Sequence, residues 1–247
     1  MKIAIISDIH GNLVALEAAL AEIDRIAPDQ IICLGDVFVT GPQPRGALAR
    51  VRALGCPVVM GNTDEWALHP QPFTIRSKAD QMLYDVELWG AQQLTGDDQD
   101  FIRTFQPTIE VDLGYGRSLL CFHGSPRSNT EIIRATTLDD ELTEKLGNNR
   151  AAIFAGGHTH VSLLRHFQNS LILNPGSVGL PFVMQPDGRR VNPAWAEYAL
   201  VEAGNGRLDI TLRRVPYDLD ALREAVAQSN MPHANVYLAD WISGDTA

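Results

Sequence analysis

The chain has 247 residues, of which 45% are hydrophobic and 20% are charged. This composition is typical of a globular protein and excludes an intrinsically disordered chain. The formal net charge is −10, which argues against broad electrostatic binding to nucleic acid or to an anionic membrane. A single phosphate-bearing ligand at a locally positive site stays compatible with that charge. The length fits one large domain or two small ones.

The cysteines and the apolar runs bear on the compartment. Cys33, Cys56 and Cys121 are odd in number and show no CxxC spacing, so we expect free thiols in a reducing environment. The apolar start "MKIAIISD" is too short for a signal peptide. No run approaches the ~18 apolar residues that a membrane span needs. These features predict a cytoplasmic protein without a membrane segment, and they leave a homo-oligomer open.

The first third of the chain alternates between strand and helix patterns. Asn12 is expected to cap the first helix, Pro28 to close it, and Gly55 to end the second. The apolar spacing predicts strands over 2–7, 30–34 and 56–61, separated by helices over 13–26 and 44–55. This βαβαβ order predicts a parallel sheet with right-handed crossovers.

The remainder is expected to complete the same α/β domain. The segment from about 66 to 106 is mostly helical in composition and forms an insert, and Thr136 is the expected cap of a helix over 137–147. Further strands are predicted over 108–113, 117–122, 151–155, 162–167 and 170–174, a hairpin over 196–203 and 207–215, and a last helix over 219–227. Because no linker or repeat interrupts the chain, we predict one domain, 1–247, containing two sheets.

Polar side chains follow five of the predicted strands, at the point where each strand ends. In open α/β sheets, ligands bind beyond the carboxyl ends of the strands. The side chains at these ends are Asp8 and His10, Asp36, Asn62, His123, and the pair His158 and His160.

Taken singly, most of these residues have ordinary explanations. An aspartate at a strand end is usually a turn or cap residue, Gly61–Asn62 usually marks a turn, and a lone His123 could be a hydrogen-bonded core residue. The pair in "GGHTH" is more informative, because residues two apart in extended backbone point to the same side and two adjacent imidazoles repel once protonated. Burying all seven polar side chains without partners would cost free energy, whereas a divalent metal centre would give each of them a partner.

The number and chemistry of these side chains indicate two metal ions. Seven protein ligands exceed what one ion takes, and a carboxylate can bridge two ions roughly 3.5–4 Å apart. Imidazole, carboxylate and amide oxygen, without thiolate, favour Mn²⁺, Fe²⁺, Zn²⁺ or Ni²⁺ over Ca²⁺.

The ordered motifs "DIH", "GD", "GNTD", "HG" and "GHTH" resemble those of the calcineurin-like metallophosphoesterase family. The segment "LNPGSVGLP", at 173–181, is similar to the small bacterial phosphodiesterase branch of that family. The resemblance implies a four-layer α/β/β/α sandwich with two facing mixed sheets. It also implies that Asp8, His10 and His160 hold one metal, that Asn62, His123 and His158 hold the other, and that Asp36 bridges both.

The resemblance further implies catalytic roles for Asp36, Asn62 and Asp64, and a substrate contact for Asn62. The chain departs from the family pattern at Thr63, where many members carry a histidine that serves as general acid. Asp64, which would orient that histidine, remains. The departure leaves open which group protonates the leaving group.

The predicted function is a phosphoesterase in which a hydroxide bridging two metals attacks phosphorus in line. Two dications with Asp8 and Asp36 leave a net charge of about +2, or about +1 with the hydroxide. A phosphodiester monoanion balances this charge, so a phosphodiesterase is favoured. Arg127 could add a cation for a monoester, which keeps a phosphomonoesterase or nucleotide phosphatase as an alternative. A silent binding scaffold, like the retromer subunit of this fold, is disfavoured because all seven ligand residues are present.

Overall fold

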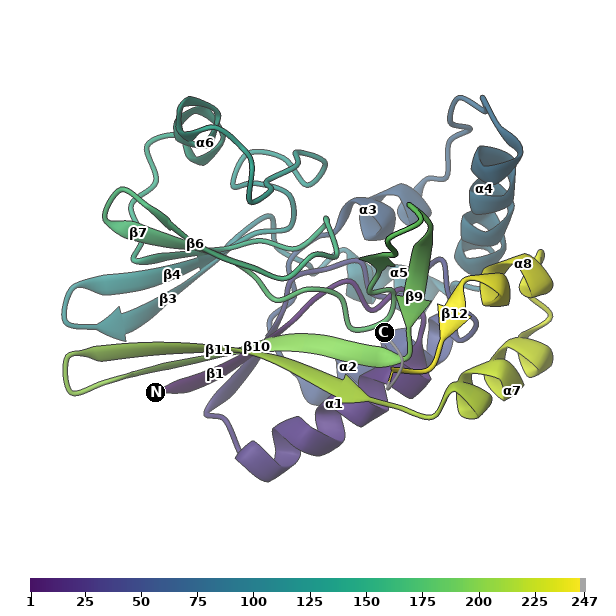
Figure 1. Ribbon diagram of the computed structural model, residues 1–247, viewed down its shortest axis with the longest axis horizontal. Coiled ribbons are helices and arrows are strands. Elements are labelled where there is room, and N and C mark those ends of the chain that lie inside the picture. Colours follow the sequence, from purple (N-terminus) through teal and green to yellow (C-terminus); the bar gives the residue numbers. More distant parts are fainter. Residues whose placement is uncertain (245–247) are drawn as a thin grey trace.

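Two β-sheets face each other at the centre of the molecule, and helices cover their outer faces (Figure 1). The computed structural model describes residues 1–244. The first sheet has the strand order β11-β10-β1-β2 and the second has the order β3-β4-β5-β7-β6. Both sheets contain parallel and antiparallel pairs. The four-layer α/β/β/α sandwich that the sequence predicted is therefore confirmed.

The first sheet and its helices follow the predicted pattern closely. The strands are β1 (Lys2–Ile6), β2 (Gln30–Cys33), β10 (Trp195–Gly204) and β11 (Arg207–Pro216), and the covering helices are α1 (Leu13–Ile26) and α2 (Pro44–Leu54). The Asn12 side chain caps α1 by accepting a hydrogen bond from the Ala15 amide at 3.0 Å. Gly55 ends α2 in the left-handed conformation, with φ of 61°.

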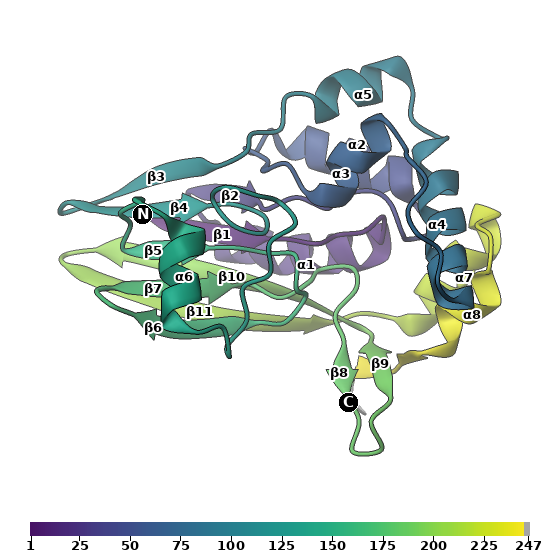
Figure 2. The same ribbon diagram turned by 90° about the horizontal axis from the view of Figure 1, so that it is seen from above.

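The second sheet is covered by a single helix, as Figure 2 shows. Its strands are β3 (Ile109–Gly114), β4 (Arg117–Cys121), β5 (Ile153–Ala155), β6 (Leu163–Phe167) and β7 (Ser170–Asn174), and the helix is α6 (Asp139–Leu146). The prediction that Thr136 caps this helix is wrong, because the helix starts at Asp139 with Leu138 as N-cap. The neighbouring Thr137 hydroxyl instead accepts from the Arg134 amide and forms a turn before the helix.

The predicted third strand over 56–61 is reduced to two isolated parallel bridges, Cys33 with Val58 and Val59 with Gln106. The segment is extended and hydrogen-bonded on both sides, but Pro57 has no amide proton to donate to β2. The Pro57 carbonyl accepts from the Cys33 amide at 3.1 Å. Val58 and Val59 therefore each make one parallel bridge, to β2 and to Gln106 respectively, and the chain then enters the next helix at Asn62.

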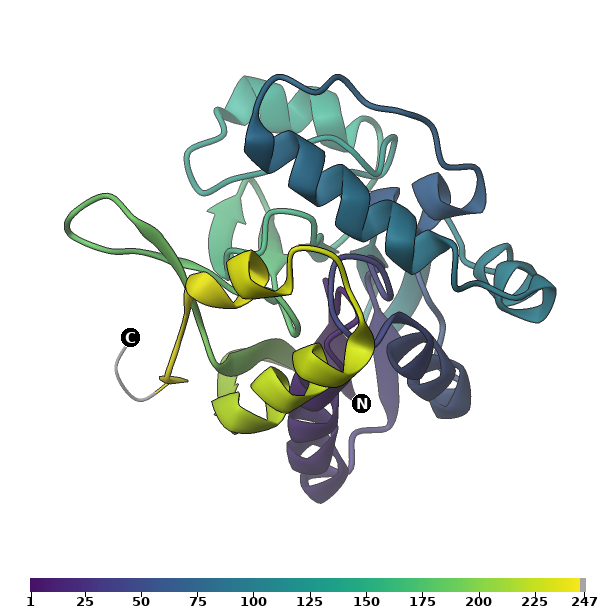
Figure 3. The same cartoon turned by 90° about the vertical axis from the view of Figure 1, so that its right-hand side faces the viewer.

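The predicted helical segment 66–106 lies at one end of the sandwich, and its first helix already begins at Asn62. The helices are α3 (Asn62–Leu68), α4 (Lys78–Ala91) and α5 (Gly96–Ile102). Val86 of α4 packs with Leu222 and Val226 of α7 (Leu219–Ser229), and Figures 1 and 3 show α4, α7 and α8 (Ala234–Ala239) at the same end. The assignment of the whole chain to one domain stays a prediction.

Three short strands were not anticipated. They are β8 (Val183–Met184), β9 (Arg190–Pro193) and β12 (Trp241–Ile242), and they form a small sheet in the order β12-β9-β8. Figure 2 shows the β8–β9 hairpin projecting from the body of the molecule. Within residues 1–244, no helix combines the length and the apolar character that crossing a membrane requires.

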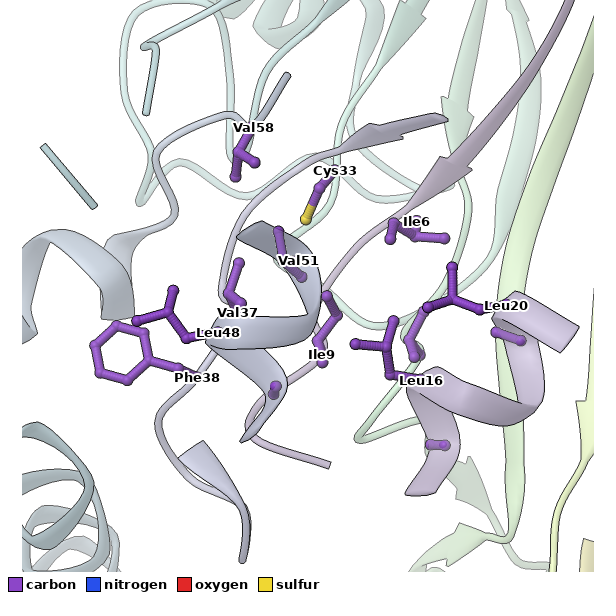
Figure 4. Close-up of a cluster of buried hydrophobic side chains, with 14 of the residues drawn as sticks. Ile6, Ile9, Leu16, Leu20, Cys33, Val37, Phe38, Leu48, Val51 and Val58 are labelled. Atoms are coloured by element: carbon purple, nitrogen blue, oxygen red, sulfur yellow. The ribbon is translucent and has the colours of Figure 1, made fainter. Parts of the chain in front are cut away.

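The alternation of side chains along each strand divides the core into layers. Ile3 and Ile5 of β1 pack between the sheets, whereas Ala4 and Ile6 face the helices. The second sheet repeats this arrangement on β4 and β5, whose odd-numbered apolar residues face the first sheet while the even-numbered ones pack toward α6. Figure 4 shows the helix-side cluster, where Leu16 and Leu20 of α1 approach strand residues. The inner strands β1, β4 and β5 are therefore buried on both faces, and the polar candidate residues follow their ends.

Candidate metal centre

The loops after the strands are held together by a continued ladder of backbone hydrogen bonds. The Asp8 amide donates to the Gly35 carbonyl at 3.0 Å and the His10 amide to the Asp36 carbonyl at 2.9 Å. In the second sheet, the Gly157 amide donates to the His123 carbonyl at 2.8 Å. These bonds bring the polar side chains of separate strands to one place.

Six of the seven candidate ligands fall into two groups. Asp8, His10 and His160 form one, and Asp36, His123 and His158 form the other; within each group the ligand atoms lie within 4.8 Å of one another. The seventh, Asn62, stands at the start of α3, and its Oδ1 lies 3.0 Å from the Nε2 of His123. This division is the one that the family resemblance implies.

The Asp36 carboxylate belongs to the second group and also lies close to the first. Its Oδ2 is 3.7 Å from the Nε2 of His10 and 3.3 Å from the Nε2 of His123, which belong to different groups. Its Oδ1 accepts a hydrogen bond from the Thr63 amide at 2.9 Å. One oxygen is therefore held by the protein, and the other faces both groups.

Three of the histidines are oriented by main-chain carbonyls. The Nδ1 atoms of His10, His123 and His160 lie 3.3, 2.7 and 2.9 Å from carbonyl oxygens of other segments. Donation of an Nδ1 proton to each carbonyl turns the Nε2 lone pair toward the centre, the usual arrangement of metal-binding histidines.

This orientation creates contacts that a proton or a metal ion must balance. The Nε2 atoms of His10 and His160 lie 2.9 Å apart, and the Oδ1 of Asp8 lies 3.2 Å from the same Nε2 of His160. Although burial acts in the other direction, Asp8 raises the pKa of His160, so a proton on His160 balances these contacts when no metal is bound. Divalent metal ions satisfy these atoms, so the donor set fits the metals expected from the sequence.

The charge states are compatible with cation binding. Burial opposes ionisation of Asp36, but the neighbouring His123 holds the pKa of this carboxyl well below its usual range. Burial and the nearby His160 lower the pKa of His10 to about 4, so this imidazole is neutral. Although burial acts in the other direction, Asp36 raises the pKa of His123 to about 10, so metal binding must displace that proton.

The backbone at the centre is strained. Five candidate ligands adopt positive φ values: Asp8 at 53°, His10 at 47°, Asp36 at 53°, His158 at 67° and His160 at 57°. In a residue with a Cβ atom, a positive φ costs about 1–3 kcal/mol, and such backbone conformations cluster at functional sites. Their concentration in three loops indicates that the geometry of the side chains is maintained at a cost in stability.

The Asp64 carboxylate is hydrogen-bonded to the main chain around Asp36. Its oxygens accept hydrogen bonds from the backbone amides of Asp36 at 2.7 Å, Val37 at 2.8 Å and Gly61 at 3.3 Å. Burial and the nearby Asp36 raise its pKa to about 7. Asp64 therefore holds the loop that presents Asp36, and its catalytic role stays a prediction. The Thr63 hydroxyl is buried without a partner among the described residues.

Arg127 is paired with carboxylates. Its guanidinium lies 2.6 Å from Glu131 and 3.1 Å from Glu144, and Glu131 also accepts from the Ser125 hydroxyl. Its charge is thus balanced within the protein, which weighs against the predicted substrate contact. That contact stays a prediction.

Sequence reasoning missed Glu87 on α4. Its exposed fraction is 9%, and burial together with the nearby Asp36 raises its pKa to about 7. It has no ion-pair partner within residues 1–244. The signal available in the sequence was one acidic residue between apolar neighbours in "VELW".

Comparison with known proteins now identifies the family. The model of the calcineurin-like phosphoesterase superfamily domain matches residues 1–204. The chain belongs to this family. It is 28% identical over 245 residues to the uncharacterised protein MJ0912 of Methanocaldococcus jannaschii, with 93% of each chain covered.

Two further comparisons involve characterised or solved relatives. The crystal structure of a metallophosphoesterase from Sphaerobacter thermophilus superposes with a TM-score of 0.72 at 26% identity, covering 97% of this chain and 98% of the other. A symmetrical bis(5'-nucleosyl)-tetraphosphatase of Pectobacterium atrosepticum is 32% identical over 118 residues, covering 45% of this chain and 40% of that one. Family membership and the two ligand groups support a metal-dependent phosphoesterase.

Glu87 provides a pH test of the buried site. Because its pKa rises from 4.5 to about 7 on folding, the folded state binds the proton more tightly. The resulting stabilisation is complete below pH 4.5 and is lost as the pH rises to about 7. Metal-free Glu87→Gln should therefore gain stability relative to the native protein between pH 5 and pH 8, measured by urea unfolding.

The matched control is Asp85→Asn on the same helix. The hydrogen bond to His233 lowers the pKa of Asp85, so this variant should show no such gain as the pH rises. A difference between Glu87→Gln and the native protein that is constant across the range would contradict the assignment.

Proposed function

We propose that the protein is a phosphodiesterase that uses two divalent transition-metal ions. Asp8, His10 and His160 hold the first ion, Asn62, His123 and His158 hold the second, and Asp36 contacts both. The observation that carries the proposal is the position of Asp36 Oδ2, within 3.7 Å of one group and 3.3 Å of the other. Manganese is our first choice among Mn²⁺, Fe²⁺, Zn²⁺ and Ni²⁺.

When bound, such ions supply Lewis acidity toward phosphoryl oxygens and activate a water for in-line attack. The protein's own residues position the reaction. The Asp8 Oδ2 accepts from the Ser7 hydroxyl and the His158 amide, which leaves Oδ1 facing the centre. With the Asn62 Oδ1 turned to His123, the amide nitrogen of Asn62 can donate to a phosphoryl oxygen of the substrate.

The preference for a diester rests on charge. Two dications with Asp8 and Asp36 leave about +2, and activation of one water reduces this to about +1. A diester monoanion balances that charge, whereas a monoester dianion exceeds it. The pairing of Arg127 with Glu131 and Glu144 supports the diester, because the cation expected to favour a monoester is already neutralised.

Two other functions remain as alternatives. Hydrolysis of a nucleotide phosphate is favoured by the 118-residue match to a bis(5'-nucleosyl)-tetraphosphatase. A catalytically silent scaffold is disfavoured, because the candidate ligands are all present and grouped. We further propose a small-molecule substrate and a cytoplasmic location, the latter supported by the free thiols of Cys33, Cys56 and Cys121.

The bridging role of Asp36 predicts a difference between two substitutions. After loading with Mn²⁺ and dialysis, the native protein should retain about two ions per chain. Asp36→Asn should lose both, because the shared ligand is weakened, whereas His160→Ala should lose chiefly one. The measurement is inductively coupled plasma mass spectrometry. Asp29→Asn, at the opposite end of β2, is the control, and full retention of both ions in Asp36→Asn would refute the bridge.

The charge balance predicts the class of ester. With Mn²⁺, bis(4-nitrophenyl) phosphate should be hydrolysed with a higher kcat/KM than 4-nitrophenyl phosphate. One unbalanced charge costs about 1–4 kcal/mol at ~4 Å, so the ratio should be about fivefold or more. A monoester preference would show that another cation reaches the phosphate. Loss of that preference in Arg127→Ala would identify this cation as Arg127.

The absence of an acid at position 63 predicts sensitivity to the leaving group. A threonine hydroxyl is too weak an acid to donate a proton near neutral pH, and general acid catalysis typically contributes ~10²–10⁴-fold. Rates for a series of diesters should therefore fall steeply as the leaving-group pKa rises. Thr63→His should reduce this dependence on the leaving group only slightly. Asp64 already accepts hydrogen bonds from backbone amides and so should orient the new imidazole poorly. A flat dependence in the native enzyme, with chemistry rate-limiting, would require another donor, with Glu87 the first to test.

A further inference from the structure

A pocket of about 470 Å³ opens beside the candidate ligand His158. Its walls come from three segments: 132–136 before α6, 158–163 between β5 and β6, and the base of the β8–β9 hairpin. Figure 2 shows that hairpin projecting from the sandwich. The volume is within the range of small-molecule sites, about 300–1,000 Å³. It exceeds what a scissile phosphate alone would fill, so the pocket has room for the rest of a substrate.

Two arginines line this pocket without carboxylate partners. Neither Arg134 nor Arg190 forms an ion pair within the described residues, and Asp240 acts on Arg190 only through a longer-range attraction. Nearby arginines differ, since Arg165 pairs with Asp139 and Arg189 pairs with Asp187 at 2.8 Å. In a chain of net charge −10, two unpaired guanidinium groups on one pocket are a local site for an anion.

The remaining wall of the pocket is apolar and accessible. Ile132 and Val161 are 38% and 48% exposed, and both line the pocket with Phe182. The guanidinium carbon of Arg190 lies 4.1 Å from the centre of the Phe182 ring. Such a stacked pair presents a flat surface on which an aromatic ring can pack.

We infer that this pocket binds the part of the substrate beyond the scissile phosphorus, and that this part carries a ring and a second anionic group. The inference rests on the proposed function and names its substrate class, a nucleotide-like diester with a further phosphate. The metal centre balances the monoanionic diester, and Arg134 and Arg190 bind the additional charge. The apolar wall and the Phe182 ring contact the ring system.

The kinetic experiment compares two substrates with the same leaving group. One is the 4-nitrophenyl ester of thymidine 5'-phosphate, and the other carries a further 3'-phosphate. The Mn²⁺-loaded native protein should show a KM lower by about tenfold or more for the second, the effect of hydrogen bonds to a charged group. The double variant Arg134→Gln/Arg190→Gln should lose this difference in KM. The control Arg189→Gln, which removes a paired charge from the same hairpin, should retain it.

A binding experiment separates this inference from the proposed function. Thymidine 3',5'-bisphosphate is titrated calorimetrically into metal-free protein, where hydrolysis plays no part. The native protein should bind it about tenfold or more tightly than the double variant does, and Phe182→Ala should bind it more weakly than the native protein. If the protein binds the bisphosphate as expected but hydrolyses no ester, the proposed function is overturned and the pocket assignment stands. Equal KM values for both esters, or binding unchanged in the double variant, would overturn the pocket assignment.

Discussion

The arrangement of the site depends on two ionised carboxylates, Asp8 and Asp36, held inside the protein where water cannot solvate them. Burying such charges is costly unless positive charge is near. In the metal-free protein, a protonated His123 supplies it beside Asp36, and His160, whose Nε2 lies 3.2 Å from the Oδ1 of Asp8, supplies it beside Asp8. Divalent cations satisfy both carboxylates, which links the stability of the site to the chemistry proposed for it.

The sandwich is what makes this placement attainable. Apolar residues on both faces of the inner strands, such as Ile5 and Ile6 of β1, bury these strands and leave their ends for polar groups. The ladder of backbone hydrogen bonds continues past those ends, and Asp64 ties the Asp36 loop with both carboxylate oxygens. Rigid loops of this kind can keep ligands at positive φ, because the surrounding core opposes their relaxation.

The elements outside the sandwich bring further groups to the candidate site. Helix α4 brings Glu87 toward the centre from one side, and the β8–β9 hairpin brings Phe182 and Arg190 to the pocket beside His158. The helical segment after Trp66 contributes this buried acid, whereas the unpaired arginines come from later segments. Groups from distant parts of the chain therefore surround the same candidate site.

The sequence by itself placed the seven candidate ligands at strand ends, because apolar periodicity is a local property. Its ordered motifs resembled those of the family, and that resemblance implied the layered fold. Asn12 and Gly55 were likewise predictable as helix ends. Tertiary structure alone decided that Asp64 binds backbone amides, that Arg127 is neutralised by Glu131, and that Glu87 is buried. Each of these depends on which groups from distant segments approach one another. Arg127 and Arg134 differ for the same physical reason. The charge of each side chain is evident from the sequence, but only the tertiary structure shows that Arg127 has carboxylate partners and that Arg134 has none within the described residues.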